Sequence, residues 1–262
     1  MIDLHIHSIY SDGTCSVEEI ISKAKDLHLT QIAITDHNNL EGSILAHQSG
    51  EIDSVIGTEL TTGYGKAEIH LLAYFPDGSA FKNVHFILKE AKVRKKIATV
   101  ETLENLNAAG INISVGELSE FTSGTINRVH ICKAMMKHGY IRSVQEGFEK
   151  YVGDNCPAYV PSEHIHLEEA IEAVHDDGGI AVIAHPFEYV DDLDVFEFLN
   201  AVEKSIDGIE CYHPSASPQQ SEQLAEFAGN HHLRITGGSD FHGGNKPDIS
   251  LGMMNVKDCF RI

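Results

Sequence analysis

The sequence has few basic residues, few cysteines and no long apolar run, and each shortage excludes a class of protein. Its 19 lysines and arginines face 39 aspartates and glutamates. The resulting formal charge of -20 opposes binding to duplex DNA or to an anionic membrane. The five cysteines include no C-x-x-C pair, so we expect neither a disulfide framework nor a zinc knuckle. No apolar stretch approaches the roughly 18 residues of a membrane span, and no signal segment precedes the first predicted strand. We therefore expect a cytoplasmic protein with reduced thiols.

Short apolar runs alternate with amphipathic stretches, which is typical of βα units around a mostly parallel sheet. We predict seven strands, near residues 1–7, 31–35, 53–58, 68–74, 179–184, 207–211 and 233–237. The capping box Ser16-Val17-Glu18-Glu19 should begin the first helix.

The strand signal disappears between the fourth and fifth of these strands. We predict helices there at about 82–109, 114–121, 127–138 and 143–151. The sequence therefore predicts a barrel domain formed by residues 1–78 and 166–262, with an inserted helical cap subdomain at 79–165. Insertions in the loops of such barrels often lie over the active-site mouth, so the insertion is a candidate lid.

Two histidines alternate with apolar residues in the first predicted strand, which reads Ile2-Asp3-Leu4-His5-Ile6-His7. Side chains alternate between the faces of a strand, so His5 and His7 should point the same way. Burying two imidazoles on an inner face is costly unless something binds them, and a metal is the simplest candidate. The alternative is a solvent-facing strand surface that carries two histidines by chance. Asp12 follows within the same dozen residues and could supply a third ligand.

Further potential ligands fall at or near the predicted carboxyl ends of the other strands, which would meet at one rim in a parallel barrel. They are Asp36, His37, Glu59, His70, His185, Glu210, Asp240 and His242. Each of these residues alone is weak evidence for a metal site. So many potential ligands at the same end of successive strands are hard to obtain by chance. Imidazole and carboxylate ligands suit Mn, Zn and Fe and do not discriminate among them. Closely spaced divalent cations would activate water for attack on a phosphate ester.

The ordered motifs resemble those of the polymerase and histidinol phosphatase (PHP) family of metal-dependent phosphoesterases. The motifs are His5-Ile6-His7, Ser11-Asp12-Gly13, Thr35-Asp36-His37, Glu59, His70, His185-Pro186 and Ser239-Asp240-Phe241-His242. The resemblance implies an α/β fold, a distorted (β/α)7 barrel, with two or three divalent metal ions. One metal would take His5, His7, Glu59 and Asp240; a second would take Asp12, His37 and His242; a third would take Glu59, His70 and His185. The resemblance also makes Asp12 and His37 candidate catalytic residues.

Three further segments resemble the small stand-alone members of this family, which act on nucleoside 3′,5′-bisphosphates and on the 5′ ends of short RNA. They are Asn127-Arg128-Val129-His130, Pro157-Ala158-Tyr159-Val160-Pro161 and Glu210-Cys211-Tyr212-His213-Pro214-Ser215. Asn127 departs from the family pattern, in which Ser or Thr is common at this place.

We predict that Arg128 is a catalytic and substrate-binding residue, because its planar guanidinium can grip a phosphate with two hydrogen bonds. The alternative is a helix-surface arginine in an ion pair. His130, Glu210 and His213 are further candidate substrate contacts, and His213 is also a candidate to protonate the leaving group. The alternatives are a capped helix histidine for His130 and an ordinary loop residue for His213.

The sequence thus predicts a phosphoesterase that uses metal-bound hydroxide on a nucleotide or on a short 5′-phosphorylated oligoribonucleotide. Histidinol-phosphate phosphatase is an alternative with the same barrel and ligands. A non-catalytic metal-binding accessory module is an alternative from another class. We expect a small phosphorylated substrate and no obligate protein partner. The dense basic run from Lys92 to Lys96 is either a solvated helix face balanced by Glu90 or a guide for an anionic ligand.

Overall fold

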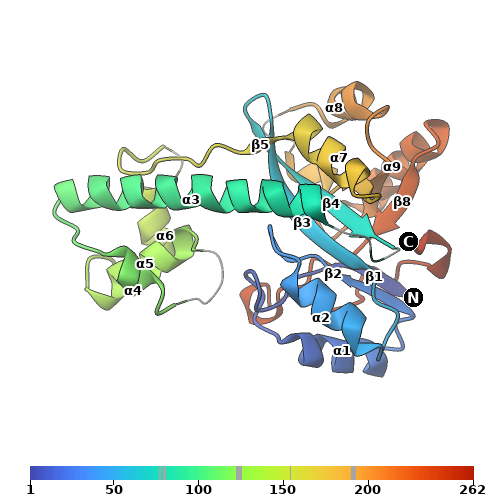
Figure 1. Ribbon diagram of the computed structural model, residues 1–262, viewed down its shortest axis with the longest axis horizontal. Coiled ribbons are helices and arrows are strands. Elements are labelled where there is room, and N and C mark those ends of the chain that lie inside the picture. The colour runs from blue at the N-terminus through green and yellow to red at the C-terminus, as the bar shows by residue number, and fades with distance from the viewer. Residues whose placement is uncertain (77, 79–80, 122–125, 154, 190–192) are drawn as a thin grey trace. The chain divides into compact units, whose positions relative to one another are not determined.

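The structure is a computed structural model that describes the chain except residues 77, 79–80, 122–125, 154 and 190–192 and the side chain of Cys259 (Figure 1). Its contacts divide the chain into two compact units, one of residues 1–88 and 164–262 and one of residues 89–163. Residue 79, where the sequence places the start of the insertion, lies outside the described residues. The four cysteines whose side chains are described form no disulfide. No described helix combines the length and the apolar character that a bilayer crossing requires.

The first unit is built on a two-stranded and a six-stranded sheet. In the smaller sheet, β1 (Ile2–Ile6) and β2 (Gln31–Ile34) run parallel. The larger sheet has the order β5-β3-β4-β6-β7-β8, with β3 (Ile56–Tyr64), β4 (Ala67–Phe75), β5 (Ile165–His166), β6 (Ile180–Ile183), β7 (Gly208–Tyr212) and β8 (Arg234–Gly237). One isolated bridge joins Ile6 of β1 to Phe241 after β8, and another joins His37 after β2 to Glu59 of β3. The unit is therefore a mixed α/β structure with a central sheet.

The direction of β4 differs from the sequence prediction. The sequence predicts 53–58 and 68–74 as members of a mostly parallel sheet, but β3 and β4 form an antiparallel hairpin, and β4 is also antiparallel to β6. β3 continues to Tyr64, and Gly65, with a φ of 61°, turns the chain directly into β4. So short a connection can join only antiparallel strands. Because β4 is antiparallel to its neighbours, its first half and not its carboxyl end lies at the rim where β1 ends. His70 is in that half and therefore still reaches the rim.

Helices cover the sheets of the first unit (Figure 1). They are α1 (Val17–Asp26), α2 (Glu41–Ser49), α7 (Leu167–Asp176), α8 (Val195–Val202) and α9 (Pro218–Asn230), with 3₁₀ turns at Pro186–Tyr189, Gly243–Asn245 and Asp258–Phe260. The predicted capping box is confirmed, since the Ser16 side chain accepts a hydrogen bond from the Glu19 N–H and the Glu19 carboxylate accepts one from the Ser16 N–H. α7 packs against β3, β4 and β6, and α9 against β7 and β8. These contacts hold the strand ends that carry the candidate ligands.

The second unit is helical, as the sequence predicts. It contains most of α3 (Lys82–Ala108), then α4 (Val115–Leu118), α5 (Arg128–Lys137), α6 (Val144–Gly147) and a π-helix at Phe148–Val152. Leu106, Ile131 and Met135 belong to its buried apolar core. In the basic run, the Arg94 guanidinium lies 3.6 Å from the Glu90 carboxylate, one helical turn away. This pair agrees with the interpretation of the run as a solvated helix face.

Candidate metal centre

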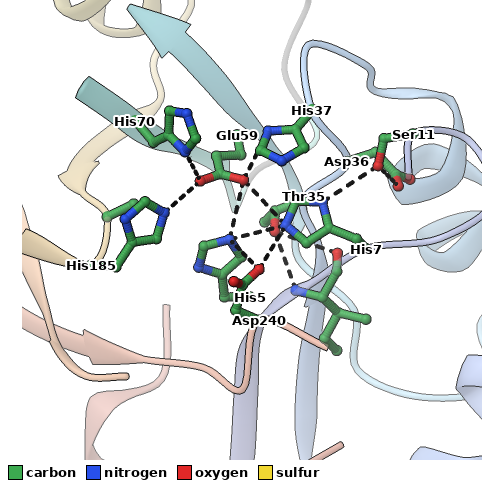
Figure 2. A network of polar contacts seen from close by, with 12 residues as sticks. His5, His7, Ser11, Thr35, Asp36, His37, Glu59, His70, His185 and Asp240 are labelled. Carbon is green, nitrogen blue, oxygen red and sulfur yellow. Dashed lines mark hydrogen bonds and ion pairs between the residues drawn. The ribbon is translucent and has the colours of Figure 1, made fainter. Parts of the chain in front are cut away.

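His5 and His7 converge at the end of β1. Their Nε2 atoms lie 3.1 Å apart, and neither residue is exposed to solvent (Figure 2). The alternation of side chains along the strand predicts this convergence. Two ring nitrogens so close together in a buried place need a cation or a proton between them and the surrounding carboxylates.

Glu59 lies at the centre of the polar network, where it is 1% exposed (Figure 2). Its Oε2 is 3.1 Å from Nε2 of His7 and 3.1 Å from Nδ1 of His37. Its Oε1 is 2.8 Å from Nδ1 of His70 and 2.9 Å from Nε2 of His185. The β3–β4 register explains the contact with His70, because the two residues are diagonal neighbours on one face of the hairpin. A carboxylate with imidazoles at both oxygens has the geometry to bridge two cations.

The segment after β8 supplies two further donors. Oδ1 of Asp240 lies 3.1 Å from Nε2 of His7 and 3.5 Å from Nε2 of His5. Nε2 of His242 lies 3.2 Å from Oδ1 of Asp12. Asp240 has a φ of 54°, a left-handed conformation that is unusual for a residue other than glycine. Such backbone strain is typical of functional sites, where neighbouring contacts hold a side chain in place.

Among the described residues, four groups of side chains could hold a metal ion. Within each group the donor atoms lie within 4.8 Å of one another. The groups are His7, Asp12, His37 and His242; His5, His213 and Asp240; His5, Glu59 and His185; and His37, Glu59 and His70. They bring together all nine predicted metal ligands and add His213. Ligands of a tetrahedral ion at 2.0–2.2 Å lie about 3.3–3.6 Å apart, close to the separations found here. The division of the donors among ions stays a prediction.

Buried atoms without hydrogen-bond partners also fit a bound cation. Within the described part of the chain these include Nδ1 of His37 and Oε2 of Glu59. Buried polar atoms normally have partners, so each of these two requires a reason. Nitrogen and oxygen donors without a thiolate match Mn, Zn or Fe.

The carboxylates and imidazoles shift each other's pKa values strongly. Burial alone would raise the pKa of Glu59, but nearby imidazoles, first of all that of His37, hold it well below its ordinary value. Burial alone would lower the pKa of His7, but the carboxylates of Asp240 and Glu59, each 3.1 Å from its Nε2, raise it to about 9. Burial lowers the pKa of His37 to about 3. The pocket therefore favours positive charge beside its carboxylates, and divalent cations would supply that charge.

Two more buried carboxylates hold the donors in position. Oε1 of Glu210 lies 3.0 Å from Nδ1 of His5, and Oε2 of Glu210 accepts the backbone N–H of His185 at 2.9 Å. This geometry supports a positioning role for Glu210, which is 1% exposed, and its role as a substrate contact stays a prediction. Asp36 accepts hydrogen bonds from the backbone N–H and the hydroxyl of Ser8, at 2.7 and 2.6 Å. Asp36 thus fixes the loop that follows β1.

Two residues that contact the centre, Lys246 and Glu68, are not among those predicted from the sequence. Lys246 forms an ion pair with Oδ2 of Asp240, and Nε2 of His213 lies 3.5 Å from the same oxygen. A single lysine in a glycine-rich segment carries no motif, so Lys246 gave no signal. Oε1 of Glu68 lies 3.1 Å from Nε2 of His70. The alternation in Glu68-Ile69-His70 places both side chains on one face and could have revealed this pair.

Arg128 and His130 belong to the second unit. The Arg128 guanidinium carbon lies 5.3 Å from the ring centre of Phe148 and 4.7 Å from that of Tyr159. Nδ1 of His130 accepts the backbone N–H of Asn127 at 3.0 Å, so His130 completes the cap of α5. This contact agrees with the alternative of a capped helix histidine. Substrate contacts by Arg128 and His130 stay predictions.

The pattern of the PHP domain matches residues 3–150 of the chain. The chain belongs to the PHP family. This PHP protein is 30% identical to the 5′-3′ exoribonuclease Rnm of Escherichia coli strain K12, over 92% of its own length and 84% of the relative's. It is 28% identical to the 3′,5′-nucleoside bisphosphate phosphatase of Chromobacterium violaceum, over 92% and 87% of the two chains. The crystal structure of a proposed metal-dependent phosphoesterase from Bifidobacterium adolescentis superposes with a TM-score of 0.82 at 28% identity, covering 96% of this chain and 90% of that one.

Proposed function

We propose that this PHP protein is a metal-dependent phosphoesterase that hydrolyses a phosphate ester in a nucleotide or in a short 5′-phosphorylated oligoribonucleotide. The observation that carries the proposal is the convergence of imidazoles on both oxygens of the buried Glu59. The two named relatives act on RNA and on nucleoside bisphosphates, which supports a nucleoside 3′,5′-bisphosphate as the smallest substrate.

The ligand sets that the family resemblance implies agree with the donor separations described above. They are His5, His7, Glu59 and Asp240 for one cation, Asp12, His37 and His242 for a second, and Glu59, His70 and His185 for a third. The unpartnered Oε2 of Glu59 faces Nε2 of His7 at 3.1 Å, which supports the first set. When bound, divalent cations would activate a water and neutralise charge on the phosphoryl group.

His213 is placed to deliver a proton. In the hydrolysis, a water oxygen bonds to phosphorus, the ester bond breaks, and the leaving nucleoside oxygen takes up a proton. Nδ1 of His213 lies 2.7 Å from the hydroxyl oxygen of Ser215, so a protonated ring can donate its Nδ1–H to that oxygen. The Nε2–H of the same ring faces Asp240, and transfer of this proton leaves a neutral imidazole. Nε2 of His213 is therefore the proposed source of the proton for the leaving oxygen.

We also propose a distorted (β/α)7 barrel for residues 1–78 and 166–262, with residues 79–165 as an inserted helical cap. The bridges from Ile6 to Phe241 and from His37 to Glu59 support closure, because the first joins β1 to the segment after β8 and the second joins the segment after β2 to β3. Arg128 and His130 are proposed substrate contacts of the cap. A guanidinium stacked on two aromatic rings has a defined orientation, and this favours phosphate binding by Arg128.

A phosphate-release assay tests the function. Protein stripped of metal and reloaded with Mn, Zn or Fe is supplied with adenosine 3′,5′-bisphosphate, a 5′-phosphorylated tetraribonucleotide or histidinol phosphate. We expect metal-dependent turnover of the first two substrates and little of the third. Faster turnover of histidinol phosphate would favour the histidinol-phosphate phosphatase alternative. Stoichiometric metal without turnover of any ester would favour the accessory module.

A further inference from the structure

The two carboxylate oxygens of Asp240 face different partners. Oδ1 lies toward Nε2 of His7 and of His5, at 3.1 and 3.5 Å, which is the side of the proposed cation. Oδ2 lies toward Nζ of Lys246 and, at 3.5 Å, toward Nε2 of His213. The Oδ2 side of Asp240 therefore has an ammonium group and an imidazole nitrogen beside it.

The backbone before Lys246 is fastened to the loop that carries Asp12. The N–H of Gly244 donates to the Thr14 hydroxyl at 2.7 Å, and the Asn245 side-chain amide donates to the Asp12 carbonyl oxygen at 2.5 Å. The Lys246 side chain is 42% exposed, while its partner Asp240 is 7% exposed. Lys246 thus extends from the rim inward and presents its ammonium group beside the candidate ligands.

An ammonium group has three N–H donors, and the ion pair with Asp240 uses one of them. With a cation held by His5, His7, Glu59 and Asp240, the Asp240 carboxylate would attract Lys246 less strongly. The ammonium group could then contact an anionic part of the substrate without leaving Asp240. A protein with a formal charge of -20 needs local positive charge of this kind to hold an anion.

The position of His213 indicates which part of the substrate lies there. If Nε2 of His213 protonates the leaving oxygen, the leaving group lies on the Oδ2 side of Asp240. In a nucleoside 3′,5′-bisphosphate, and at the end of a 5′-phosphorylated RNA, the leaving group at the 3′ ester is a nucleoside that still bears its 5′-phosphate. That second phosphate therefore belongs on the side where Lys246 lies.

We propose that Lys246 binds the 5′-phosphate of the leaving nucleotide and so selects substrates with a second phosphate over otherwise identical monophosphates. The inference rests on the proposed function and adds a specificity-determining residue to it. The chemistry recognised is a phosphate group on the leaving nucleoside.

Lys246→Ala tests the proposal against adenosine 3′,5′-bisphosphate and adenosine 3′-monophosphate, which differ only in the second phosphate. We expect the ratio of kcat/KM for the bisphosphate to that for the monophosphate to fall about tenfold or more, as for loss of a charge-assisted hydrogen bond. Lys246→Arg should keep most of the ratio, because it keeps the charge. Calorimetry of adenosine 5′-monophosphate binding to the metal-loaded protein gives a second readout, with a similar loss of affinity expected in Lys246→Ala.

Lys25→Ala is the matched control. Lys25 also pairs with a carboxylate, Glu51, at 2.9 Å, but this pair is exposed. Lys25 lies in the last turn of α1, near the start of β2, and Gln31 at that start pairs with Ile2 at the beginning of β1. The control lysine is therefore at the other end of the strands from His7, and its removal should leave the ratio unchanged.

Two results would overturn the proposal. One is an equal loss of activity on both substrates, or loss of metal, in Lys246→Ala, since Lys246 would then only balance the charge of Asp240. The other is an unchanged affinity of that variant for adenosine 5′-monophosphate. A wild-type protein that binds metal but hydrolyses neither substrate would contradict the proposed function instead, and the binding measurement would still decide the role of Lys246.

Discussion

Both carboxylate oxygens of Glu210 lie close to Nδ1 of His5, at 3.0 and 3.2 Å, and neither side chain is exposed. The two residues are 205 positions apart in the chain. Glu210 comes from β7 and His5 from β1, so the pair connects the two sheets of the first unit. With Nδ1 held by Glu210, the His5 ring presents Nε2 to Glu59 and Asp240.

Glu210→Gln should weaken metal binding by about 10–100-fold, the usual effect of changing a carboxylate that orients a metal-ligating histidine. The amide of glutamine cannot accept hydrogen bonds at both of its terminal atoms, so it cannot serve both the His5 ring and the His185 N–H. Titration of the metal-free variant with Mn²⁺ or Zn²⁺ by calorimetry measures the change. Glu51→Gln, at an exposed ion pair, is the control. An unchanged affinity would show that His5 needs no orienting partner.

His37→Ala and Asp240→Ala should each lose both stoichiometric metal and phosphoesterase activity, because each removes a donor from the network around Glu59. Metal content by mass spectrometry and phosphate release from adenosine 3′,5′-bisphosphate are measured on the same samples. Asp176→Ala, at an exposed position near the end of α7, should keep both. Full activity with stoichiometric metal in either site variant would remove that residue from the proposed ligands.

The sequence predicts the donors of this centre better than the arrangement of the strands that carry them. The alternation of His5 and His7 depends only on local strand geometry, and the capping box at Ser16 depends only on residues three positions apart, so both could be predicted. The direction of β4 depends on the turn at Gly65, and a single glycine does not distinguish a hairpin from a longer connection. The contact of Lys246 with Asp240 depends on how a loop folds back, which no periodic pattern encodes.

Gly238→Ala should disturb the centre through the backbone of β1. A Cβ atom at Gly238 would lie 2.3 Å from Cβ and 2.5 Å from the backbone nitrogen of His5, so β1 or the segment after β8 would have to move. We expect a loss of about 1–3 kcal/mol in the free energy of unfolding, as for other overpacked sites. We also expect weaker metal binding, because His5 is displaced. Chemical denaturation and metal titration measure the two effects.

Gly229→Ala is the control for that change. Apart from its chain neighbours and the nearby backbone of α9, no heavy atom lies within 4 Å of a Cβ at Gly229. Alanine should therefore be accommodated there and stabilise the helix by up to about 1 kcal/mol. If Gly238→Ala is as stable as wild type and binds metal equally well, the close approach of Gly238 to His5 is not needed for the site.

Metal should stabilise the folded protein, and Glu59→Gln should remove most of this effect. Asp12, Glu59 and Asp240 bring several negative charges together, and a cation that binds only the folded state stabilises it by mass action. At a metal concentration 100 times the Kd, this amounts to about 2.7 kcal/mol for one site. Thermal unfolding with metal and with a chelator should therefore give a clear difference in Tm for wild type and a small one for Glu59→Gln. Equal Tm values for wild type in both conditions would contradict metal binding to the native state.

Asn127→Ser should leave the stability of α5 nearly unchanged, whereas Asn127→Ala should cost about 1 kcal/mol. Asn127 differs from the Ser or Thr common in the family, but its side chain accepts the N–H of His130 and caps the helix in the same way. We therefore expect this departure to leave substrate choice unaffected. A serine variant with altered selectivity between adenosine 3′,5′-bisphosphate and the tetraribonucleotide would show that Asn127 does more than cap the helix.

Arg128→Lys should raise KM for adenosine 3′,5′-bisphosphate about tenfold or more while metal content stays unchanged. A lysine keeps the charge, but it has no planar group to stack between Phe148 and Tyr159 and no paired N–H groups for two phosphate oxygens. Arg142→Lys, at an exposed position in the same unit, is the control for an arginine without this stacking role. If Arg128→Lys lowers Tm but leaves KM unchanged, the guanidinium serves the packing of the second unit alone, and the substrate contact must be sought on other residues.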